Sequence, residues 1–229
     1  MSIAERSTRL VNVGEFASTG EPENLGSLYL SCPFERQYIL RMVVRADSRL
    51  MSLPPELKWL VPLGAKAVAH QWSMRLNHPF CYITVRHGVV TSQTDDQWHV
   101  DGFSTRQPHV PEQNYIWCNT VGTEYVPLEV PFPKGFDPLV HNINSYLQKF
   151  IDPSRIANCE ENTLYCMDPY ILHRRPPTTA GMVRTFVRMS FVPIEINDVN
   201  NTPNPLLPRA YNRDGVEHRN TLIDYEENA

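Results

Sequence analysis

Short runs of alternating apolar and polar residues dominate the chain between about residues 80 and 195. Each run is rich in β-branched and aromatic side chains and is bounded by turn-forming residues, which is typical of β-strands. The predicted strands cover residues 82–90, 115–120, 125–130, 163–172 and 185–193. One segment with helical periodicity, residues 139–149, interrupts them. The pattern therefore predicts a β-rich core over residues 80–195.

Residues 33–78 instead carry apolar positions at helical spacing. In residues 35–50 these positions predict a first helix, and they are Tyr38, Ile39, Met42 and Val43. A second helix is expected after the proline pair at 54–55, because proline is tolerated in the first turn of a helix. We expect this helical part to buttress the sheet. Before it, residues 26–30 predict one further strand.

A few helices followed by many strands predict an α+β fold, with the strands in a two-sheet jelly roll. The 229 residues, with 41% hydrophobic content, can bury one good core, so we expect a single domain over residues 1–229. Residues 196–229 are polar and rich in proline, but too apolar in their middle to be simply disordered. We expect this C-terminal extension to pack over the barrel or across a homodimer interface.

His99 and Asp101, separated by Val100, carry the most specific chemistry. Alternate residues of a strand point to one side, so both side chains could reach one metal ion while Val100 packs the other way. Two imidazoles and one carboxylate occupy one face of an octahedral Fe(II) and leave three positions open. His173 is the candidate third ligand. The tripeptide alone is weak evidence, because 8 His and 25 acidic residues produce such a match about once by chance.

Two arginines follow His173 on a strand that has one polar face. That face carries Arg184, Phe186, Arg188 and Ser190. The opposite face is apolar and carries Val183, Val187, Met189 and Phe191 together with Thr185. A planar guanidinium matches the two oxygens of a carboxylate, so both arginines are candidate anion-binding residues.

Residues 80–195 resemble the Fe(II)/2-oxoglutarate-dependent dioxygenases. The signature of that superfamily is H-x-D/E, a distant His and an Arg a short way downstream. Here it matches His99-Val100-Asp101, then His173, then Arg184 or Arg188, which follow His173 by 11 and 15 positions. Arg188-Met189-Ser190 is also similar to the R-x-S motif, in which both side chains bind the far carboxylate of 2-oxoglutarate.

The resemblance implies a double-stranded β-helix with the metal at its open end. It implies Fe(II) bound by His99, Asp101 and His173, and 2-oxoglutarate held by Arg188 and Ser190. Arg184 would then bind the near carboxylate of 2-oxoglutarate or an anion of the substrate, and the exchanged assignment of the two arginines stays open. The implied reaction is oxidation of a C–H bond, most directly hydroxylation, with decarboxylation of 2-oxoglutarate to succinate. Desaturation, epoxidation and cyclisation are the other outcomes.

The substrate is expected to be a small anionic metabolite, because Arg184 supplies a second guanidinium near the iron. Candidate residues for the substrate wall flank the ligands or share their strand faces, and they are Trp98, Phe103, Trp117, Asn119 and Arg184. Packing explains each of them equally well. Arg174 and Arg175 are expected to be solvated, with contact with an acidic substrate as the alternative. Cys118 and Cys166 are expected to be small buried residues.

Composition and net charge indicate which cellular compartment and which binding partners to expect. Five cysteines without a C-x-x-C pair fit a reducing compartment. The chain has no signal-peptide core near residue 1 and no apolar run of membrane-spanning length, so we expect a cytoplasmic protein. A net charge of −4 and a pI of about 6.1 disfavour nucleic acid as a partner. The expected partners are a small-molecule substrate and dioxygen.

Three other functions fit the same residues. A nucleobase-oxidising dioxygenase acting on DNA or RNA would share the R-x-S pattern. A cupin-like metalloenzyme that works without 2-oxoglutarate would need the three ligands but not Arg188. A non-catalytic cupin-like module would keep the fold and lose the iron.

Overall fold

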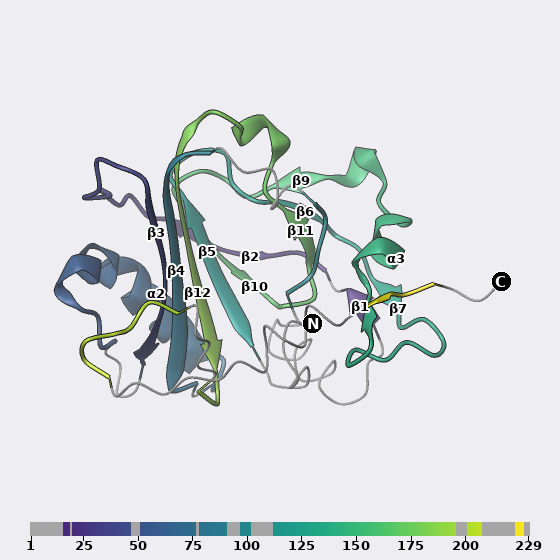
Figure 1. Cartoon of the computed structure of the whole chain (residues 1–229), viewed down its shortest axis with the longest axis horizontal. Helices are drawn as coiled ribbons and strands as arrows, with labels where there is room; N and C mark the ends of the chain where they lie inside the picture. The colour runs from purple at the N-terminus through teal and green to yellow at the C-terminus, as the bar shows by residue number, and fades with distance from the viewer. Residues whose placement is uncertain are drawn as a thin grey trace.

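Antiparallel strands dominate the computed structural model, which describes residues 16–18, 20–46, 51–76, 78–90, 97–101, 112–195, 201–207 and 223–226. Six strands form one sheet at the centre of Figure 1. Their order is β2 (Glu23–Ser27), β10 (Thr163–Met167), β5 (Gln113–Cys118), β12 (Val183–Val192), β4 (Phe80–Val89) and β3 (Tyr38–Arg45). All neighbours in this sheet run antiparallel.

A smaller sheet and two strand pairs lie on the other side of the molecule (Figure 1). The smaller sheet has the order β11 (Leu172–Arg174), β6 (Glu124–Val126) and β9 (Ala157–Asn158). One pair joins β1 (Phe16–Ser18) to β7 (Val130–Pro131), and the other joins β8 (His141–Asn142) in parallel to β13 (Ile223–Asp224). The chain is therefore a mixed α/β protein with mainly antiparallel sheets and few helices.

One face of the six-stranded sheet is covered by η1 (Pro55–Leu60) and α2 (Val61–Ser73), at the left of Figure 1. A proline stands in the first turn of each, as the sequence predicts for the second helix. Fully buried side chains of the two helices and the sheet form one core, including Leu57, Leu60, Leu63, Met42, Val85, Val187 and Met189. Each buried leucine contributes about 2 kcal/mol to the free energy of unfolding. The predicted buttress is confirmed for this segment.

The helix predicted over residues 35–50 is wrong, because residues 38–45 form strand β3. Leu40, Met42 and Val44 point into the helix-covered core, whereas Val43 packs on the opposite face. Since both faces of β3 are partly buried, apolar residues occur on each, and their combined spacing imitates a helix.

Other predicted elements exist with different bounds. The strand expected at 26–30 is β2, which ends at Ser27. The run at 125–130 divides into β6 and β7, and the run at 163–172 divides into β10 and β11. The helix expected at 139–149 is confined to α3 (Asn144–Gln148), with β8 before it. Short 3-10 turns, η2 (Pro153–Arg155) and η3 (Pro177–Thr179), occupy two connections.

The described parts of the C-terminal extension pack on the same chain. The Thr202 amide donates to the Arg41 carbonyl at 2.6 Å, and the Asn204 side-chain amide donates to the Val43 carbonyl at 2.8 Å. Both carbonyls belong to β3, an edge strand, so the extension satisfies acceptors that the sheet leaves open. Residues 201–207 thus pack against the β3 edge of the six-stranded sheet, and packing over a barrel and a homodimer both stay predictions.

No helix in the part of the chain that the structure describes is long and apolar enough to cross a membrane.

Candidate metal centre

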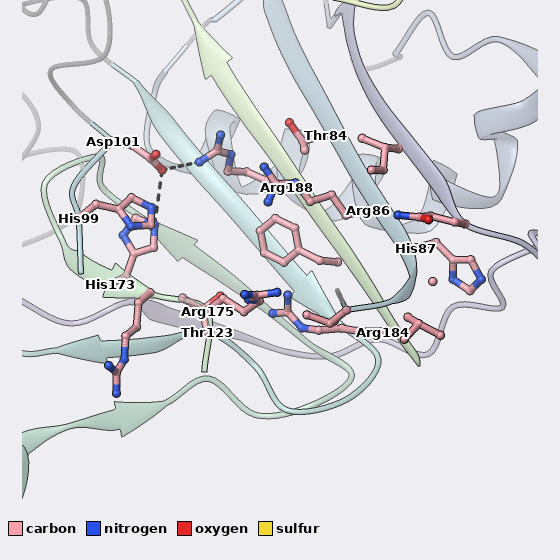
Figure 2. A pocket seen from close by; sticks show the side chains of 17 residues that line it. Thr84, Arg86, His87, His99, Asp101, Thr123, His173, Arg175, Arg184 and Arg188 are labelled. Atoms are coloured by element: carbon pink, nitrogen blue, oxygen red, sulfur yellow. Dashed lines mark hydrogen bonds and ion pairs between the residues drawn. The ribbon is translucent and has the colours of Figure 1, made fainter. Parts of the chain in front are cut away.

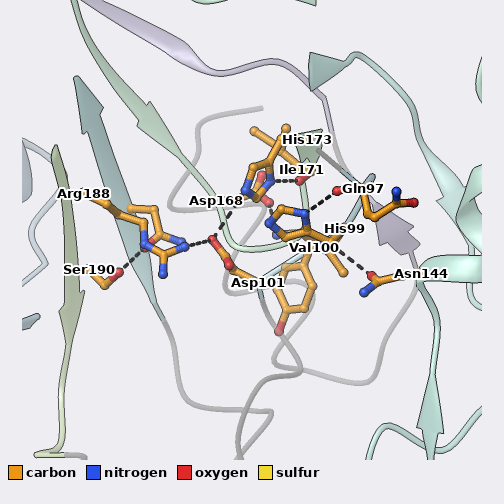
Figure 3. Close-up of polar contacts among 12 residues, drawn as sticks. Gln97, His99, Val100, Asp101, Asn144, Asp168, Ile171, His173, Arg188 and Ser190 are labelled. Carbon is orange, nitrogen blue, oxygen red and sulfur yellow. Dashed lines mark hydrogen bonds and ion pairs between the residues drawn. The ribbon is translucent and has the colours of Figure 1, made fainter. Parts of the chain in front are cut away.

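His99, Asp101 and His173 meet at one place, as the sequence predicts. Their ligand atoms all lie within 4.8 Å of one another. His99 and His173 face each other across an antiparallel bridge, with both reciprocal N–H to carbonyl hydrogen bonds at 3.0 Å. The Asp101 amide donates to the Pro169 carbonyl at 2.8 Å, and the Val100 amide donates to the Asn144 side chain at 3.2 Å (Figure 3). These backbone contacts hold the segment 97–101 against β11.

The hydrogen bonds of the two rings determine which nitrogen can bind a metal. Nδ1 of His99 lies 2.7 Å from the Gln97 carbonyl oxygen, and Nδ1 of His173 lies 2.8 Å from the Ile171 carbonyl oxygen (Figure 3). A carbonyl only accepts, so each Nδ1 carries a proton and Nε2 is the ring atom left to bind a metal. Burial is the main cause that lowers the pKa of His173 to about 4, so this ring is neutral at pH 7. Metal-binding histidines in proteins use this arrangement.

Asp101 is ionised and oriented by an arginine. Nη1 of Arg188 donates to Oδ2 of Asp101 at 2.6 Å, and Nε2 of His173 lies 3.7 Å from the same oxygen. Burial opposes ionisation of Asp101, but the charge of Arg188 and its hydrogen bond to the carboxylate hold the pKa of the carboxyl well below its usual range. A carboxylate is the form that binds a cation.

A stacked arginine supports the two histidine ligands from outside. Nε of Arg174 donates to Oε2 of Glu124 at 2.6 Å, and its guanidinium lies 4.5 Å from the centre of the Trp98 ring. Arg174 follows His173 and Trp98 precedes His99, so this contact joins the two ligand-bearing segments. The expectation that Arg174 is solvated is wrong, because its side chain is 23% exposed and ion-paired.

The three candidate ligands open into a cavity of about 500 Å³ between β4, β12 and β11 (Figure 2). This volume lies in the range of small-molecule sites. Besides the three ligands, five arginines line the cavity: Arg86, Arg174, Arg175, Arg184 and Arg188. Arg184, Phe186 and Arg188 all face it, which confirms the predicted polar face of this strand. Arg175 is half-buried and lines the cavity, so its contact with a substrate stays a prediction.

Arg184 is a buried cation with weak partners. Its side chain is 7% exposed, and Nη2 donates to the Cys118 thiol at 3.0 Å, a weak acceptor. Its guanidinium lies 5.1 Å from the Phe186 ring centre, and its Nε has no hydrogen-bond partner among the described residues. A buried guanidinium without a strong acceptor is a ready site for an anion.

Arg188 and Ser190 are engaged differently from what the resemblance implies. Arg188 is bound to Asp101, and the Ser190 hydroxyl donates to Oδ1 of Asn114. Ser190 is buried and is not among the described residues that line the cavity. The two side chains therefore do not converge on one open acceptor site.

Of the residues expected in the substrate wall, Arg184 lines the cavity, whereas Trp98, Trp117 and Asn119 do not. Trp117 belongs to the core under α2, 1% exposed, with Nε1 donating to the Leu28 carbonyl at 2.7 Å, so its assignment to the wall is wrong. Trp98 is buried in the core beneath the small sheet. The Asn119 side chain accepts from the Thr185 amide at 2.7 Å and continues the β5–β12 pairing. Phe103 lies outside the described residues.

The cavity also includes residues that sequence reasoning missed. On β4 these are Thr84, Arg86 and His87, and before β3 there is Gln37. Thr84 and Arg86 alternate along β4, so the period of the strand predicts a shared face. Only the pairing of Arg86 with Phe186 places that face beside Arg184 and Arg188.

The buried cysteines agree with prediction. Cys118 is 3% exposed and Cys166 is fully buried. Burial raises the pKa of the Cys118 thiol, although the charge of Arg184 opposes the shift. Cys118 is therefore a thiol that touches Arg184, not a thiolate.

Comparison with known proteins finds only distant structural likenesses. No protein-family model and no curated protein matches the chain. EvdO2 from Micromonospora carbonacea var. aurantiaca, solved in complex with 2-oxoglutarate, matches with a TM-score of 0.45 and 13% identity over 90% of this chain and 87% of that one. AviO1 from Streptomyces viridochromogenes Tue57 matches with a TM-score of 0.39 and 13% identity over 89% and 86%. Likenesses this low identify neither the family nor the reaction of this chain.

Proposed function

We propose that this chain is an Fe(II)- and 2-oxoglutarate-dependent dioxygenase that hydroxylates a C–H bond of a small anionic metabolite. The observation that carries the proposal is the convergence of His99, Asp101 and His173 within 4.8 Å, with both Nδ1 atoms bound to carbonyl oxygens. Two imidazoles and one carboxylate, opening into a cavity, are the donor set of a facial Fe(II) site. The chemistry that Fe(II) supplies there is oxidation by dioxygen, coupled to decarboxylation of 2-oxoglutarate to succinate.

The chain's own residues would prepare this site. His99 and His173 would present Nε2 to the metal, because a backbone carbonyl holds the Nδ1 atom of each ring. Arg188 would keep Asp101 ionised and oriented, which leaves Asp101 ready to bind the metal. Half-buried Phe186 lines the cavity and would limit the access of water beside the ligands.

Arg184 is our candidate for the far carboxylate of 2-oxoglutarate. It faces the same cavity as the candidate ligands, it is buried, and it donates to the Cys118 thiol, which is a weak acceptor. Arg188 would need to leave Asp101 to take that role. This is the exchange of the two arginines that the sequence left open.

The six-stranded sheet and the small sheet would then be the two walls of a double-stranded β-helix. Three observations support this architecture. The strands pair antiparallel, His173 on β11 is bridged to His99, and the cavity lies between β12 and β11. Dioxygen and a small molecule would be the partners, in a single domain.

The test is to treat the purified protein with a chelator, titrate it anaerobically with Fe(II) and 2-oxoglutarate by calorimetry, and then measure succinate release in air. We expect one Fe(II) per chain and succinate release that depends on it. His99→Ala, Asp101→Ala and His173→Ala should each abolish iron binding. His87→Ala is the matched control, because His87 lines the same cavity and its Nδ1 lies 2.9 Å from the Thr185 hydroxyl.

Each competing function has its own outcome in this experiment. Iron binding without any succinate would favour a cupin-like metalloenzyme. Failure to bind iron would favour a non-catalytic module. Succinate release stimulated chiefly by oligonucleotides would favour nucleobase oxidation.

A further inference from the structure

The guanidinium of Arg184 is held by two neutral side chains. Its Nη2 donates to the Cys118 sulfur at 3.0 Å, and its Cζ lies 5.1 Å from the centre of the Phe186 ring. Arg184 is 7% exposed, and its Nε is buried without a hydrogen-bond partner among the described residues. A fully buried arginine usually has a charged partner, whereas neither Cys118 nor Phe186 carries a charge.

Strand pairing fixes the position of Cys118. Cys118 stands opposite Phe186 across β5 and β12, so Arg184 lies on the neighbouring diagonal of the same face. The next residue continues the pairing. The Asn119 amide donates to the Thr185 carbonyl at 3.2 Å, and the Asn119 side chain accepts from the Thr185 amide at 2.7 Å. The thiol therefore has a fixed place from which to orient the guanidinium.

A thiol at this place does not neutralise Arg184. Burial raises the pKa of the Cys118 thiol, although the charge of Arg184 opposes the shift, so the thiol is protonated at pH 7. A protonated thiol accepts a weak hydrogen bond and brings no negative charge. The carboxylate of Asp101, which lines the same cavity, is hydrogen-bonded to Arg188. Cys118 thus holds the guanidinium in place and leaves its charge for another group.

We propose that Cys118 is a positioning residue for anion binding, whose neutral thiol orients the Arg184 guanidinium and leaves its charge for a carboxylate of the co-substrate. The inference rests on the proposed function for the identity of that carboxylate as the far one of 2-oxoglutarate. A packing role alone would make only the size of this side chain matter. A positioning role makes its charge and its hydrogen bond matter as well.

The charge at position 118 is tested with two substitutions of similar size. In Cys118→Asp, the introduced carboxylate would pair with Arg184 and compete with the co-substrate, and we expect the affinity for 2-oxoglutarate to fall by about tenfold or more. Cys118→Asn is neutral, so it should bind 2-oxoglutarate at least about tenfold more tightly than Cys118→Asp. Anaerobic calorimetry on the full chain with Fe(II) measures both affinities.

Removing the hydrogen bond tests whether the thiol acts through Arg184. Cys118→Ala should weaken 2-oxoglutarate binding by about threefold to tenfold, and Cys118→Ser, which keeps an acceptor, should recover most of this loss. In Arg184→Gln the same alanine substitution should have almost no further effect, because both changes interrupt one interaction. In succinate release, Cys118→Ala should raise the KM for 2-oxoglutarate and change kcat little.

Cys166 supplies the matched control. It is fully buried, but its sulfur lies 3.7 Å from Oε1 of Gln113, in the core beneath α2. Cys166→Ala and Cys166→Ser should lower stability and leave the affinity for 2-oxoglutarate unchanged. A thermal unfolding scan of each variant verifies the fold. If Cys118→Asp does not fold, the alanine and serine variants and the double variant with Arg184→Gln decide the proposal.

Three results would overturn the proposal. Equal affinities in Cys118→Asp and Cys118→Asn would mean that the charge at this position does not affect the bound anion. Losses in Cys118→Ala and Arg184→Gln that add in the double variant would mean that Cys118 does not act through Arg184. Losses of the same size in the Cys166 variants would mean a general effect of substitutions in the core.

Glutarate binding to the iron-free chain separates this proposal from the proposed function. Glutarate has both carboxylates of 2-oxoglutarate and lacks its keto oxygen. If glutarate binding depends on Arg184 and Cys118 as above, but Fe(II) does not bind and no succinate forms, the proposed function fails and the positioning role is supported. Iron-dependent succinate release with a KM unaffected by Cys118→Ala would leave the proposed function standing and overturn the positioning role. Binding of neither 2-oxoglutarate nor glutarate would overturn both.

Discussion

Nη1 of Arg188 on β12 donates to Oδ2 of Asp101 at 2.6 Å, across 87 positions of sequence. This contact ties the central strand of the large sheet to the segment that carries two of the three candidate ligands. By the R-x-S motif, the Arg188 guanidinium would bind 2-oxoglutarate. In the structure it is hydrogen-bonded to Asp101, a candidate metal ligand.

Substitution of Arg188 should weaken iron binding more than 2-oxoglutarate binding. In Arg188→Gln, Asp101 loses the charge that ionises and orients it, and we expect Fe(II) affinity to fall by about tenfold to a hundredfold, as for other partners of metal ligands. Anaerobic calorimetry measures this change, with Arg188→Lys as a partial rescue. Unchanged iron affinity together with a large loss of 2-oxoglutarate affinity would restore the assignment drawn from the motif.

Substitution of Arg184 should weaken the binding of 2-oxoglutarate. Arg184→Gln removes a buried guanidinium, and we expect the KM for 2-oxoglutarate to rise by about tenfold or more while Fe(II) affinity changes little. The measurement is succinate release at varied 2-oxoglutarate concentration. An unaltered KM in the variant would show that Arg184 does not bind 2-oxoglutarate.

Substitution of Arg174 should loosen the pair of histidine ligands. Arg174→Ala removes both the ion pair with Glu124 and the stacking on Trp98, and we expect roughly tenfold weaker Fe(II) binding. Arg174→Lys keeps the charge but not the planar stacking, so it should restore only part of the affinity. Arg155→Ala is the control, because Arg155 binds a backbone carbonyl of Pro127. Equal losses in both alanine variants would contradict a role for the stacked arginine.

Trp117 should matter for stability and not for substrate binding. Trp117→Ala should lower the free energy of unfolding by about 3–5 kcal/mol, because it removes a large side chain that is 1% exposed. Chemical denaturation measures this, and Trp72→Ala, at a side chain 46% exposed, should cost far less. A raised KM with unchanged stability in Trp117→Phe would return Trp117 to the cavity wall.

His78 should make the fold sensitive to acid. Burial lowers its pKa to about 4 from a usual value of 6.5, although a hydrogen bond to the Phe191 backbone opposes the shift. Between these pH values the unfolded chain binds a proton that the folded chain does not, so the free energy of unfolding falls as the pH drops, by about 3 kcal/mol at most.

Replacing His78 should remove this contribution. Chemical denaturation of His78→Gln between pH 8 and about 4 should give a shallower pH dependence than the unsubstituted chain. His173 also has a lowered pKa, but it is present in both chains and cancels in the comparison. Parallel curves would show that His78 does not titrate in this way.

Much of the candidate site was predictable because its signals are local. The two-residue period of a strand puts His99 and Asp101 on one side, and it puts Arg184, Phe186 and Arg188 on one face. The proline pair at 54–55 likewise marks where the helical buttress begins. Each of these features depends on neighbouring residues alone.

The tertiary structure decided the rest, because pairing between distant strands is not encoded in any short window. Two features depend on the register of β4 and β12 and on the return of the chain in β11. They are the hydrogen bond between Arg188 and Asp101 and the position of Arg86 in the lining of the cavity. Trp117 faces the helices and not the cavity because α2 covers that side of β5. Residues 38–45 form a strand despite helical spacing, since pairing with β4 and burial on both faces outweigh local propensity.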